Sequence, residues 1–290
     1  MTHIERFRKL LAQDGLTVIP GCYDAIGAKL IEKAGFDALY VTGSGVSLTL
    51  LGHPDVNTVS YEELYQKVYQ IRSATDLPML VDIDTGFGGP LNIIRLIKDF
   101  ERIDIAAVQI EDQVAPKRCG HEKGRMVVPV EEMFCRIRAI ADTRRENGIV
   151  IIARTDSYSS LGIDEAITRA NCYLEAGADI IFVESPENKA DIRRVTQEVK
   201  GPVLFNNVEG GRSPFLRADE LQEYGFRFVI YPNAVTRVVC KKVTELLETL
   251  KAEGTTEPMW KDMMDHKQVW SLFGSEAFYK TESKYTNFRK

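Results

Sequence analysis

Short runs of apolar, often β-branched residues alternate along the chain with longer segments in which apolar side chains recur at helical spacing. The runs predict eight strands, at residues 17–20, 38–42, 78–84, 106–112, 149–155, 179–184, 202–206 and 228–232. The longer segments predict helices near 24–35, 60–74, 90–103, 130–147, 163–176, 188–199, 217–224 and 233–253. Nearly continuous apolar strands need cover on both faces, so the pattern predicts a parallel sheet enclosed by helices.

The joints between helices and strands support this order. Glycine ends the predicted helix two or three residues before the strand in "EKAGFDALYVT" (32–42), "LEAGADIIFVE" (174–184) and "QEYGFRFVIYP" (222–232), as expected of a left-handed C-cap. Eight such units with right-handed crossovers predict a single (β/α)8 TIM-type barrel domain over residues 1–290. A doubly wound open sheet is the alternative. Residues from about 255 to 290 exceed what eight units need and predict a C-terminal helical extension that packs on the barrel or on a neighbouring subunit.

Composition narrows the class of ligand. The 290 residues are 44% hydrophobic and carry a net charge of -5 from interspersed charges, which gives no basic footprint for nucleic acid and no polybasic patch for a membrane. The N-terminal segment is amphipathic, without the apolar core of a signal peptide, and no apolar run approaches 18 residues. We therefore expect a cytoplasmic protein that binds a small molecule.

One of the five cysteines stands in an unusual setting. The chain has no CxxC pair and only four histidines, which disfavours a disulfide framework and a structural zinc site. Cys119, in "PKRCGHEKGRMVVP" (116–129), lies among Lys117, Arg118 and His121, and neighbouring positive charge favours the thiolate. Its loop is long for a connection after a strand, which is typical of a lid, although an exposed thiol in a mobile loop would show the same sequence.

Polar residues gather where the predicted strands end. They are Tyr40, Thr42, Asp82, Asp84, Glu111, Asp112, Arg154, Asp156, Glu184, Asn206 and Tyr231. The carboxyl ends of barrel strands form the active-site face. Asp82, Asp84 and Glu111 offer oxygen ligands suited to Mg²⁺ or Mn²⁺. Arg154 either grips a substrate carboxylate through two hydrogen bonds or neutralises these acids in a buried ion pair.

Two glycine-rich stretches follow the second and third strands, "TGSGVS" (42–47) and "TGFGGP" (85–90). Backbone N–H groups at such turns form nests for anions. Neither stretch matches a P-loop or a complete dinucleotide fingerprint, so a carboxylate or a phosphonate fits better than a nucleotide.

These motifs together resemble a known family. "KRCGH" (117–121), with "VDIDTGFGG" before it and "ARTD" (153–156) after it, is similar to the isocitrate lyase and phosphoenolpyruvate mutase superfamily. The resemblance is to its short group of methylisocitrate lyases, dimethylmalate lyases and carboxyphosphonoenolpyruvate mutases. It runs from "IPGCYDA" through "GHPD" and "FNNVEGG" to "IYPNA", which is nearly the whole chain.

The resemblance implies a role for each matching residue. Asp82 and Asp84 would bind Mg²⁺, with Glu111 and Asp55 acting through waters. The substrate-binding set would be Thr42, Gly43, Ser44, Gly120, Arg154, Glu184, Asn206, Asn207, Val208 and Arg237. The catalytic set would be Cys119 as acid/base, Arg154, His121 and Tyr40, with Tyr40 as the base. Family members are homotetramers that exchange a C-terminal helix, which would explain the extension.

One departure bears on the substrate. Near "MMDHKQVW", His266 stands where methylisocitrate lyases carry an arginine for a third carboxylate, so a dicarboxylate of the 2,3-dimethylmalate type becomes more plausible. The expected function is a Mg²⁺-dependent carbon–carbon lyase that cleaves a 2-hydroxy dicarboxylate, of the 2,3-dimethylmalate or 2-methylisocitrate type, by retro-aldol chemistry. The alternatives are a carboxyphosphonoenolpyruvate phosphonomutase, an oxaloacetate decarboxylase or hydrolase, and a non-catalytic barrel that binds dicarboxylates. No lysine ends a strand, which argues against a Schiff-base aldolase.

Replacing Cys119 with serine tests the predicted acid. Loss of a positioned acid lowers turnover by a factor of about 10² or more, while substrate affinity should change little. Steady-state kinetics on the best substrate provide the measurement, and turnover equal to that of the wild type would remove Cys119 from the mechanism.

Overall fold

A computed structural model describes residues 1–118, 120 and 124–286. Its contacts divide the chain into two compact units, Met1–Val235 and Thr236–Lys290. The strands are β1 Thr17–Cys22, β2 Leu39–Val41, β3 Met79–Asp82, β4 Ala107–Glu111, β5 Val150–Thr155, β6 Ile180–Val183, β7 Val203–Asn206 and β8 Phe228–Tyr231. The helices are α1 His3–Ala12, α2 Ala25–Lys33, α3 Gly43–Leu51, α4 Tyr61–Arg72, α5 Pro90–Arg102, α6 Val130–Thr143, α7 Tyr158–Leu161, α8 Ile163–Glu175, α9 Lys189–Glu198, α10 Ala218–Tyr224, α11 Ala234–Glu253, η1 Glu257–Asp262, α12 His266–Leu272 and α13 Ser275–Thr286.

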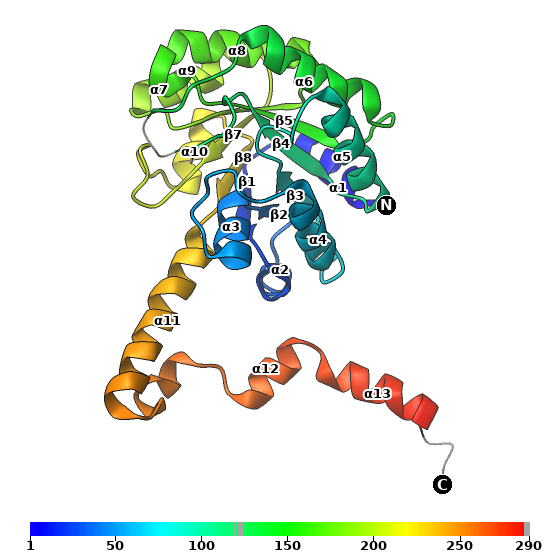
Figure 1. Cartoon of the computed structure of the whole chain (residues 1–290), viewed down its shortest axis with the longest axis vertical. Coiled ribbons are helices and arrows are strands. Elements are labelled where there is room, and N and C mark those ends of the chain that lie inside the picture. Colours follow the sequence, from blue (N-terminus) through cyan, green and yellow to red (C-terminus); the bar gives the residue numbers. More distant parts are fainter. Residues whose placement is uncertain (119, 121–123, 287–290) are drawn as a thin grey trace. The chain divides into compact units, whose positions relative to one another are not determined.

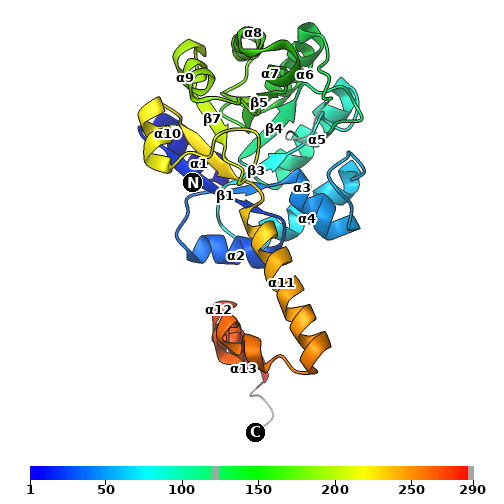
Figure 2. The ribbon, with the colours of Figure 1, turned by 90° about the vertical axis from the view of Figure 1, so that its left-hand side faces the viewer.

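The eight strands form one closed parallel barrel in sequence order, with helices around it (Figures 1 and 2). The closing pair joins β1 to β8, with Val18 opposite Val229 and Ile19 opposite Ile230. This pairing confirms the predicted (β/α)8 barrel and excludes the open doubly wound sheet, in which the outer strands would have no partner on one side.

The sequence pattern missed two helices in the loops after strands. α3 begins at Gly43, where "TGSGVS" had been expected to form an anion nest, and Thr42 is its N-cap. α7, Tyr158–Leu161, follows β5. The first turn of a helix also presents unpaired backbone N–H groups, so the N-terminus of α3 offers donors to an anion by a different geometry from the predicted one.

Side chains alternate between the inside and the outside of the barrel, because successive residues of a strand point to opposite faces. On β5, Val150 and Ile152 belong to the core inside the barrel, whereas Ile151 and Ala153 belong to the larger core between strands and helices. The barrel is thus a solid core with its own inner apolar layer.

Helix α1 contributes to the inner core. Phe7 is fully buried and stacks on Phe228 of β8 with ring centroids 5.3 Å apart. Thr2 and Glu5 form a capping box that fixes the start of α1. The N-terminal helix therefore packs its apolar side chain against the interior of the barrel.

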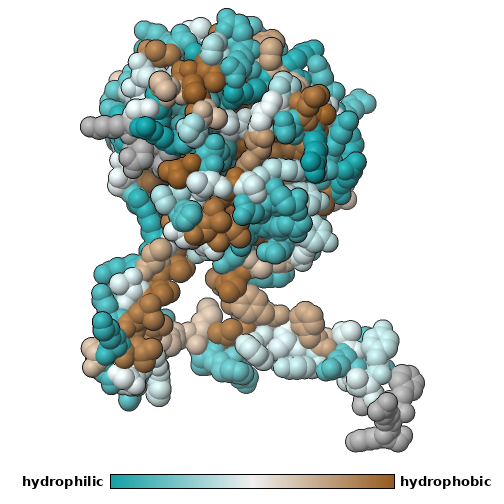
Figure 3. All heavy atoms as spheres, viewed as in Figure 1, coloured by the Kyte–Doolittle hydropathy of each residue, from teal (hydrophilic) through white to brown (hydrophobic). Residues whose placement is uncertain are grey.

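The second unit is built from helices that bury no apolar side chain among its described residues. Its exposed apolar residues include Val239, Leu247, Trp260, Trp270 and Phe278, and Figure 3 shows apolar side chains gathered on these helices. A search of the described helices finds none with the length and apolar character needed to cross a bilayer.

Replacing Phe7 with alanine tests the packing of α1. Removing a fully buried phenyl ring should lower the free energy of unfolding by about 3–5 kcal/mol. Leu91→Ala is the control, because Leu91 is 80% exposed and its loss should change stability by less than about 0.5 kcal/mol. Urea unfolding measures both, and equal midpoints would show that α1 is not part of the folded core.

Candidate active site

The inward register of the strands brings the predicted site residues together. The inner-core residues Leu80, Ile152, Phe182 and Leu204 are each followed two positions later by a polar residue at the end of the strand. These polar residues are Asp82, Arg154, Glu184 and Asn206. Because the period of a strand is two, the same face that is apolar within the barrel becomes charged at its carboxyl end.

A cavity with an empty volume of about 390 Å³ lies among these residues. Its lining consists of Tyr40, Thr42, Ser44, Asp55, Asp82, Gly120, Arg154, Phe182, Glu184, Asn206, Val208, Ile230, Pro232 and Asn233. Most of the residues expected in the site are therefore neighbours in space. Cys119 and His121 lie outside the described residues, so their expected roles stay predictions.

Three expected substrate ligands, Gly43, Asn207 and Arg237, do not line this cavity. Gly43 lines a neighbouring hollow. Asn207 has the opposite register to Asn206, and its amide donates to the carbonyl of Leu216 at 2.7 Å and contacts the Tyr231 hydroxyl at 3.0 Å. It secures the segment after β7. Arg237 belongs to the second unit, and its role in binding substrate stays a prediction.

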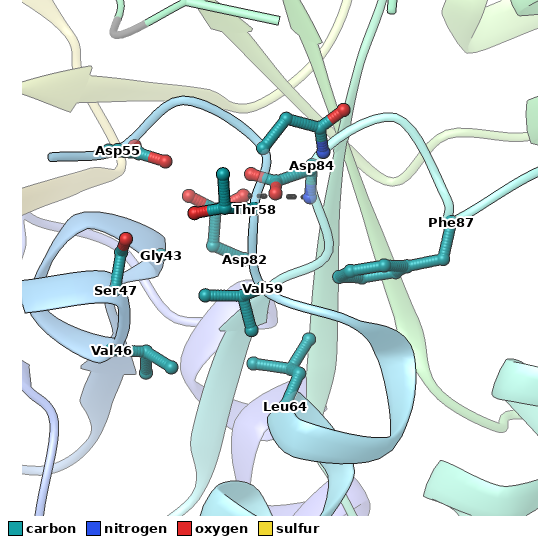
Figure 4. Close-up of a pocket in the computed structure, with 11 residues that line it drawn as sticks. Gly43, Val46, Ser47, Asp55, Thr58, Val59, Leu64, Asp82, Asp84 and Phe87 are labelled. Carbon is teal, nitrogen blue, oxygen red and sulfur yellow. Dashed lines mark hydrogen bonds between the residues drawn. The ribbon is translucent and has the colours of Figure 1, made fainter. Parts of the chain in front are cut away.

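A second hollow, with an empty volume of about 280 Å³, shares Asp55 and Asp82 with the first cavity. Figure 4 shows Asp55, Asp82 and Asp84 above the apolar side chains of Val46, Val59 and Leu64. A Cβ atom added to Gly43 would stand 3.1 Å from Asp82 Oδ2, so the N-terminus of α3 approaches the carboxylates closely.

Lys117 pairs with two of these carboxylates. Its Nζ lies 2.6 Å from Asp55 Oδ1 and 2.8 Å from Asp84 Oδ1, and its side chain is only 3% exposed. Burial by itself lowers the pKa of Lys117, but the carboxylates of Asp84, Glu111, Asp55 and Asp82 outweigh burial and raise that pKa well above its usual value. Lys117 thus contacts Asp55 and Asp84 directly, and its effect on the Cys119 thiol stays a prediction.

The acidic residues fit a divalent cation held partly through water. Burial and the neighbouring Asp84 raise the pKa of Asp82 to about 6, and burial raises the pKa of Glu111 well above its usual value. Neither carboxylate oxygen of Glu111 has a hydrogen-bond partner. The described residues contain no group of three or more side chains that would hold a metal directly. Mg²⁺ commonly binds through one or two carboxylates and keeps its remaining waters.

Arg154 is held in place by a buried pair of charges. Its Nε and Nη2 donate to the two oxygens of Asp156 at 2.8 and 2.9 Å, and Arg125 Nη1 donates to the same carboxylate at 2.5 Å. Burial opposes the charge of Arg154, but Asp156, Glu184 and Glu111 outweigh burial and raise its pKa. Burial likewise favours a neutral Asp156, but Arg154 and Arg125 lower the pKa of that carboxyl below its usual value.

Arg154 neutralises acids in a buried ion pair, and its role in binding a substrate carboxylate stays a prediction. One edge of the guanidinium is paired with Asp156, while the side chain lines the cavity and its Nη1 lies 3.5 Å from Glu184 Oε2. Its Cζ also lies 5.2 Å from the centre of the Phe182 ring. Arg154 is a fixed cation that faces the cavity.

Tyr40 belongs to a hydrogen-bonded chain that ends at an acid. Its hydroxyl donates to Gln109 Oε1 at 2.6 Å, and Gln109 Nε2 donates to Asp82 Oδ1 at 3.1 Å. Burial and the charge of Asp82 raise the pKa of Tyr40 well above its usual value. A phenol that stays protonated serves better as a hydrogen-bond donor than as the base that the resemblance implies.

The fold and this cavity define a (β/α)8-barrel enzyme whose active site collects acids and one cavity-lining arginine at the carboxyl ends of its strands. The model of the phosphoenolpyruvate phosphomutase family matches residues 7–251, and the chain belongs to that family. This membership confirms the resemblance found in the sequence.

Curated relatives are similar over almost the full chain. A 2,3-dimethylmalate lyase of Eubacterium barkeri is 40% identical over 289 residues, which cover 100% of both chains. A 2-methylisocitrate lyase of Halalkalibacterium halodurans is 41% identical over 94% of this chain and 90% of its own. The chain is thus most readily compared with lyases.

Solved structures share the whole architecture. An oxaloacetate acetylhydrolase in complex with the inhibitor 3,3-difluorooxalacetate matches with a TM-score of 0.93 and 30% identity, covering 100% of this chain and 99% of that one. A phosphonopyruvate hydrolase in complex with oxalate and Mg²⁺ matches with a TM-score of 0.88 and 26% identity, covering 98% and 99%.

Replacing Asp156 with asparagine tests the support of Arg154. The change leaves two buried guanidinium groups without their shared counter-charge, so the free energy of unfolding should fall by about 3–5 kcal/mol, and kcat/KM should fall by at least about tenfold. Asp164→Asn is the control, because the Asp164 side chain is 87% exposed. Urea unfolding and steady-state kinetics report the two effects, and an unchanged kcat/KM would show that Arg154 needs no support from Asp156.

Proposed function

We propose that this chain is a Mg²⁺-dependent carbon–carbon lyase, with Mn²⁺ as a possible substitute. Its substrate is a 2-hydroxy dicarboxylate of the 2,3-dimethylmalate or 2-methylisocitrate type, which it cleaves by retro-aldol chemistry to a 2-oxo acid and a carboxylate. Family membership and the two lyases at 40 and 41% identity support the reaction class. The observation that carries the proposal is the convergence of Arg154 with Asp55, Asp82 and Glu184 on one cavity.

Asp82 and Asp84 would hold the cation, with Glu111 and Asp55 acting through waters. Two observations support this assignment. The Glu111 oxygens accept no hydrogen bond, although Oε2 lies 3.4 Å from Arg154 Nε. Burial and Asp84 raise the pKa of Asp82, so a bound cation would add counter-charge to buried acids. When bound, the cation acts as a Lewis acid that stabilises negative charge on the oxygens of the substrate.

The charges of the cavity favour a substrate with two carboxylates. Arg154 is the one cationic side chain among the described residues that line the cavity, and its fixed guanidinium can bind one carboxylate. The first turn of α3, with Gly43 and Ser44, offers backbone donors to a second. A third carboxylate would meet Glu184 and Asp82 in the same lining, which supports 2,3-dimethylmalate over 2-methylisocitrate.

The chain's own residues then account for the movement of protons. A base in the cavity takes the hydroxyl proton of the substrate as the bond between C2 and C3 breaks, and the 2-oxo acid keeps its carboxylate near Arg154. The electron pair of the broken bond stays on C3, and that carbon takes a proton from Cys119. Tyr40 lines the cavity and donates its single hydroxyl proton to Gln109 Oε1. It would stabilise oxygen charge on the substrate by turning this proton from Gln109 toward the substrate.

A second reaction has specific support. The solved oxaloacetate acetylhydrolase superposes over the full chain, which favours hydrolysis of oxaloacetate as the alternative. Decarboxylation of oxaloacetate and the phosphonomutase reaction expected from the "KRCGH" motif remain further candidates.

We further infer a homotetramer in which the second unit exchanges between subunits, and a cytoplasmic location. The described residues of the second unit bury no apolar side chain but expose several, among them Val239, Leu247 and Trp270. Apolar helices of this kind are stabilised when a partner covers them.

One panel of substrates tests the proposed function. Release of 2-oxo acid from 2,3-dimethylmalate, 2-methylisocitrate and isocitrate, and formation of oxalate and acetate from oxaloacetate, are measured with and without Mg²⁺. We expect the highest kcat/KM with 2,3-dimethylmalate and at least about a hundredfold loss when EDTA removes the metal. Activity with oxaloacetate alone would establish the alternative, and silence throughout would contradict both.

A further inference from the structure

A buried serine connects the end of β6 to the loop after β4. Ser185 directly follows Glu184 and is only 2% exposed. Its Oγ lies 2.5 Å from Glu184 Oε1 and 3.0 Å from the carbonyl oxygen of Gly120. A hydroxyl carries one proton, so Oγ donates to one of these acceptors or shares the proton between them. One acceptor is on the wall of the cavity, and the other is on the loop that carries "KRCGH".

Gly120 is pressed against the cavity wall at this contact. A Cβ atom added to Gly120 would stand 2.4 Å from Arg154 Nη2 and 2.7 Å from Glu184 Cδ. No side chain fits there, because both neighbours are themselves held in place: Arg154 by Asp156 and Glu184 by the Asn206 amide, which donates to Oε2 at 3.2 Å. The position of the Gly120 peptide is thus set by these contacts and by Ser185.

The backbone of Ser185 adopts a conformation that few side chains favour. Its φ is 56°, in the left-handed region, and the next residue is Pro186, which restricts it further. Such conformations persist where the surrounding structure imposes them, and they often occur at functional sites. Here the conformation places Oγ between Glu184 and Gly120.

We propose that Ser185 is a positioning residue, whose hydroxyl fixes the Gly120 peptide and the Glu184 carboxylate against each other at the edge of the cavity. The consequence for chemistry rests on the proposed function. Gly120 directly follows the proposed proton donor, Cys119, in the sequence. Loss of the hydroxyl should therefore slow proton transfer more than it weakens substrate binding.

Two substitutions separate this role from a contribution to folding. Ser185→Ala removes the hydroxyl and keeps the strained backbone, whereas Ser185→Gly removes the hydroxyl and tolerates a positive φ. We expect kcat to fall at least about tenfold in both variants, with KM within about twofold of the wild type. The thermal midpoint of Ser185→Gly should equal or exceed that of Ser185→Ala. Ser160→Ala is the control, since it removes a hydroxyl from an exposed turn.

A measurement without turnover completes the test. The folded full-length protein is treated with iodoacetamide and then digested, and mass spectrometry of the peptides gives the alkylation rate of Cys119. This rate should differ from that of the wild type by at least about threefold in both variants. Alkylation of the exposed Cys135 should stay constant. Wild-type kcat in Ser185→Ala, or recovery of kcat in Ser185→Gly, would overturn the role of Ser185. A wild-type enzyme that is silent on the whole substrate panel would instead overturn the proposed function, and the alkylation rates would then decide for or against Ser185.

Discussion

The site depends on the two-residue period of the strands in a closed barrel. Once β1 pairs with β8, each strand has one face inside the barrel along its whole length. The last inward position of a strand then opens on the active-site face. Arg154 reaches the cavity because Val150 and Ile152 fill the inner core, and a shift of one residue would send it outward. Asp112 and Thr155 illustrate the outward register: they bond to each other at 2.7 Å behind the barrel wall, where Tyr173 also donates to Asp112.

This arrangement gathers buried carboxylates at the carboxyl ends of the strands. Five acids of the site lie within ion-pair distance of a basic residue: Asp55, Asp84, Glu111, Asp156 and Glu184. A sixth acid, Asp82, feels the charges of Lys117 and Arg154. The described basic residues of the cluster are Lys117, Arg125 and Arg154, so the acids outnumber them. Buried carboxylates need counter-charge to remain ionised. The proposed divalent cation would supply that counter-charge, and it would also let the proposed dianionic substrate enter an acidic cavity.

The fold could be predicted from the sequence because the apolar pattern indicates each strand and helix, and the glycines that end helices mark where each helix stops. It was also sufficient for the strand-end residues, whose direction follows from strand period alone. The same period would have separated Asn206, the last residue of β7, from Asn207, which directly follows it, since successive residues of an extended chain point to opposite faces. The side-chain directions of loop residues follow no such two-residue period. The inward directions of Lys117 and Arg125 depend on the path of the backbone after β4, which the sequence does not express.

The loop after β4 nevertheless has a physical reason to carry its basic residues. Its described part places Lys117 against Asp55 and Asp84 and Arg125 against Asp156, so the loop supplies two of the three cations of the cluster. Gln113 reinforces the loop by accepting from the backbone N–H of Arg118 and donating to its carbonyl, both at 2.9 Å. Removing this loop from the acids would leave carboxylates unpaired on the barrel. The position of the loop therefore depends on the charge of the acids that it contacts. A proton or ligand that changes this charge also changes the strength with which Lys117 and Arg125 hold the loop.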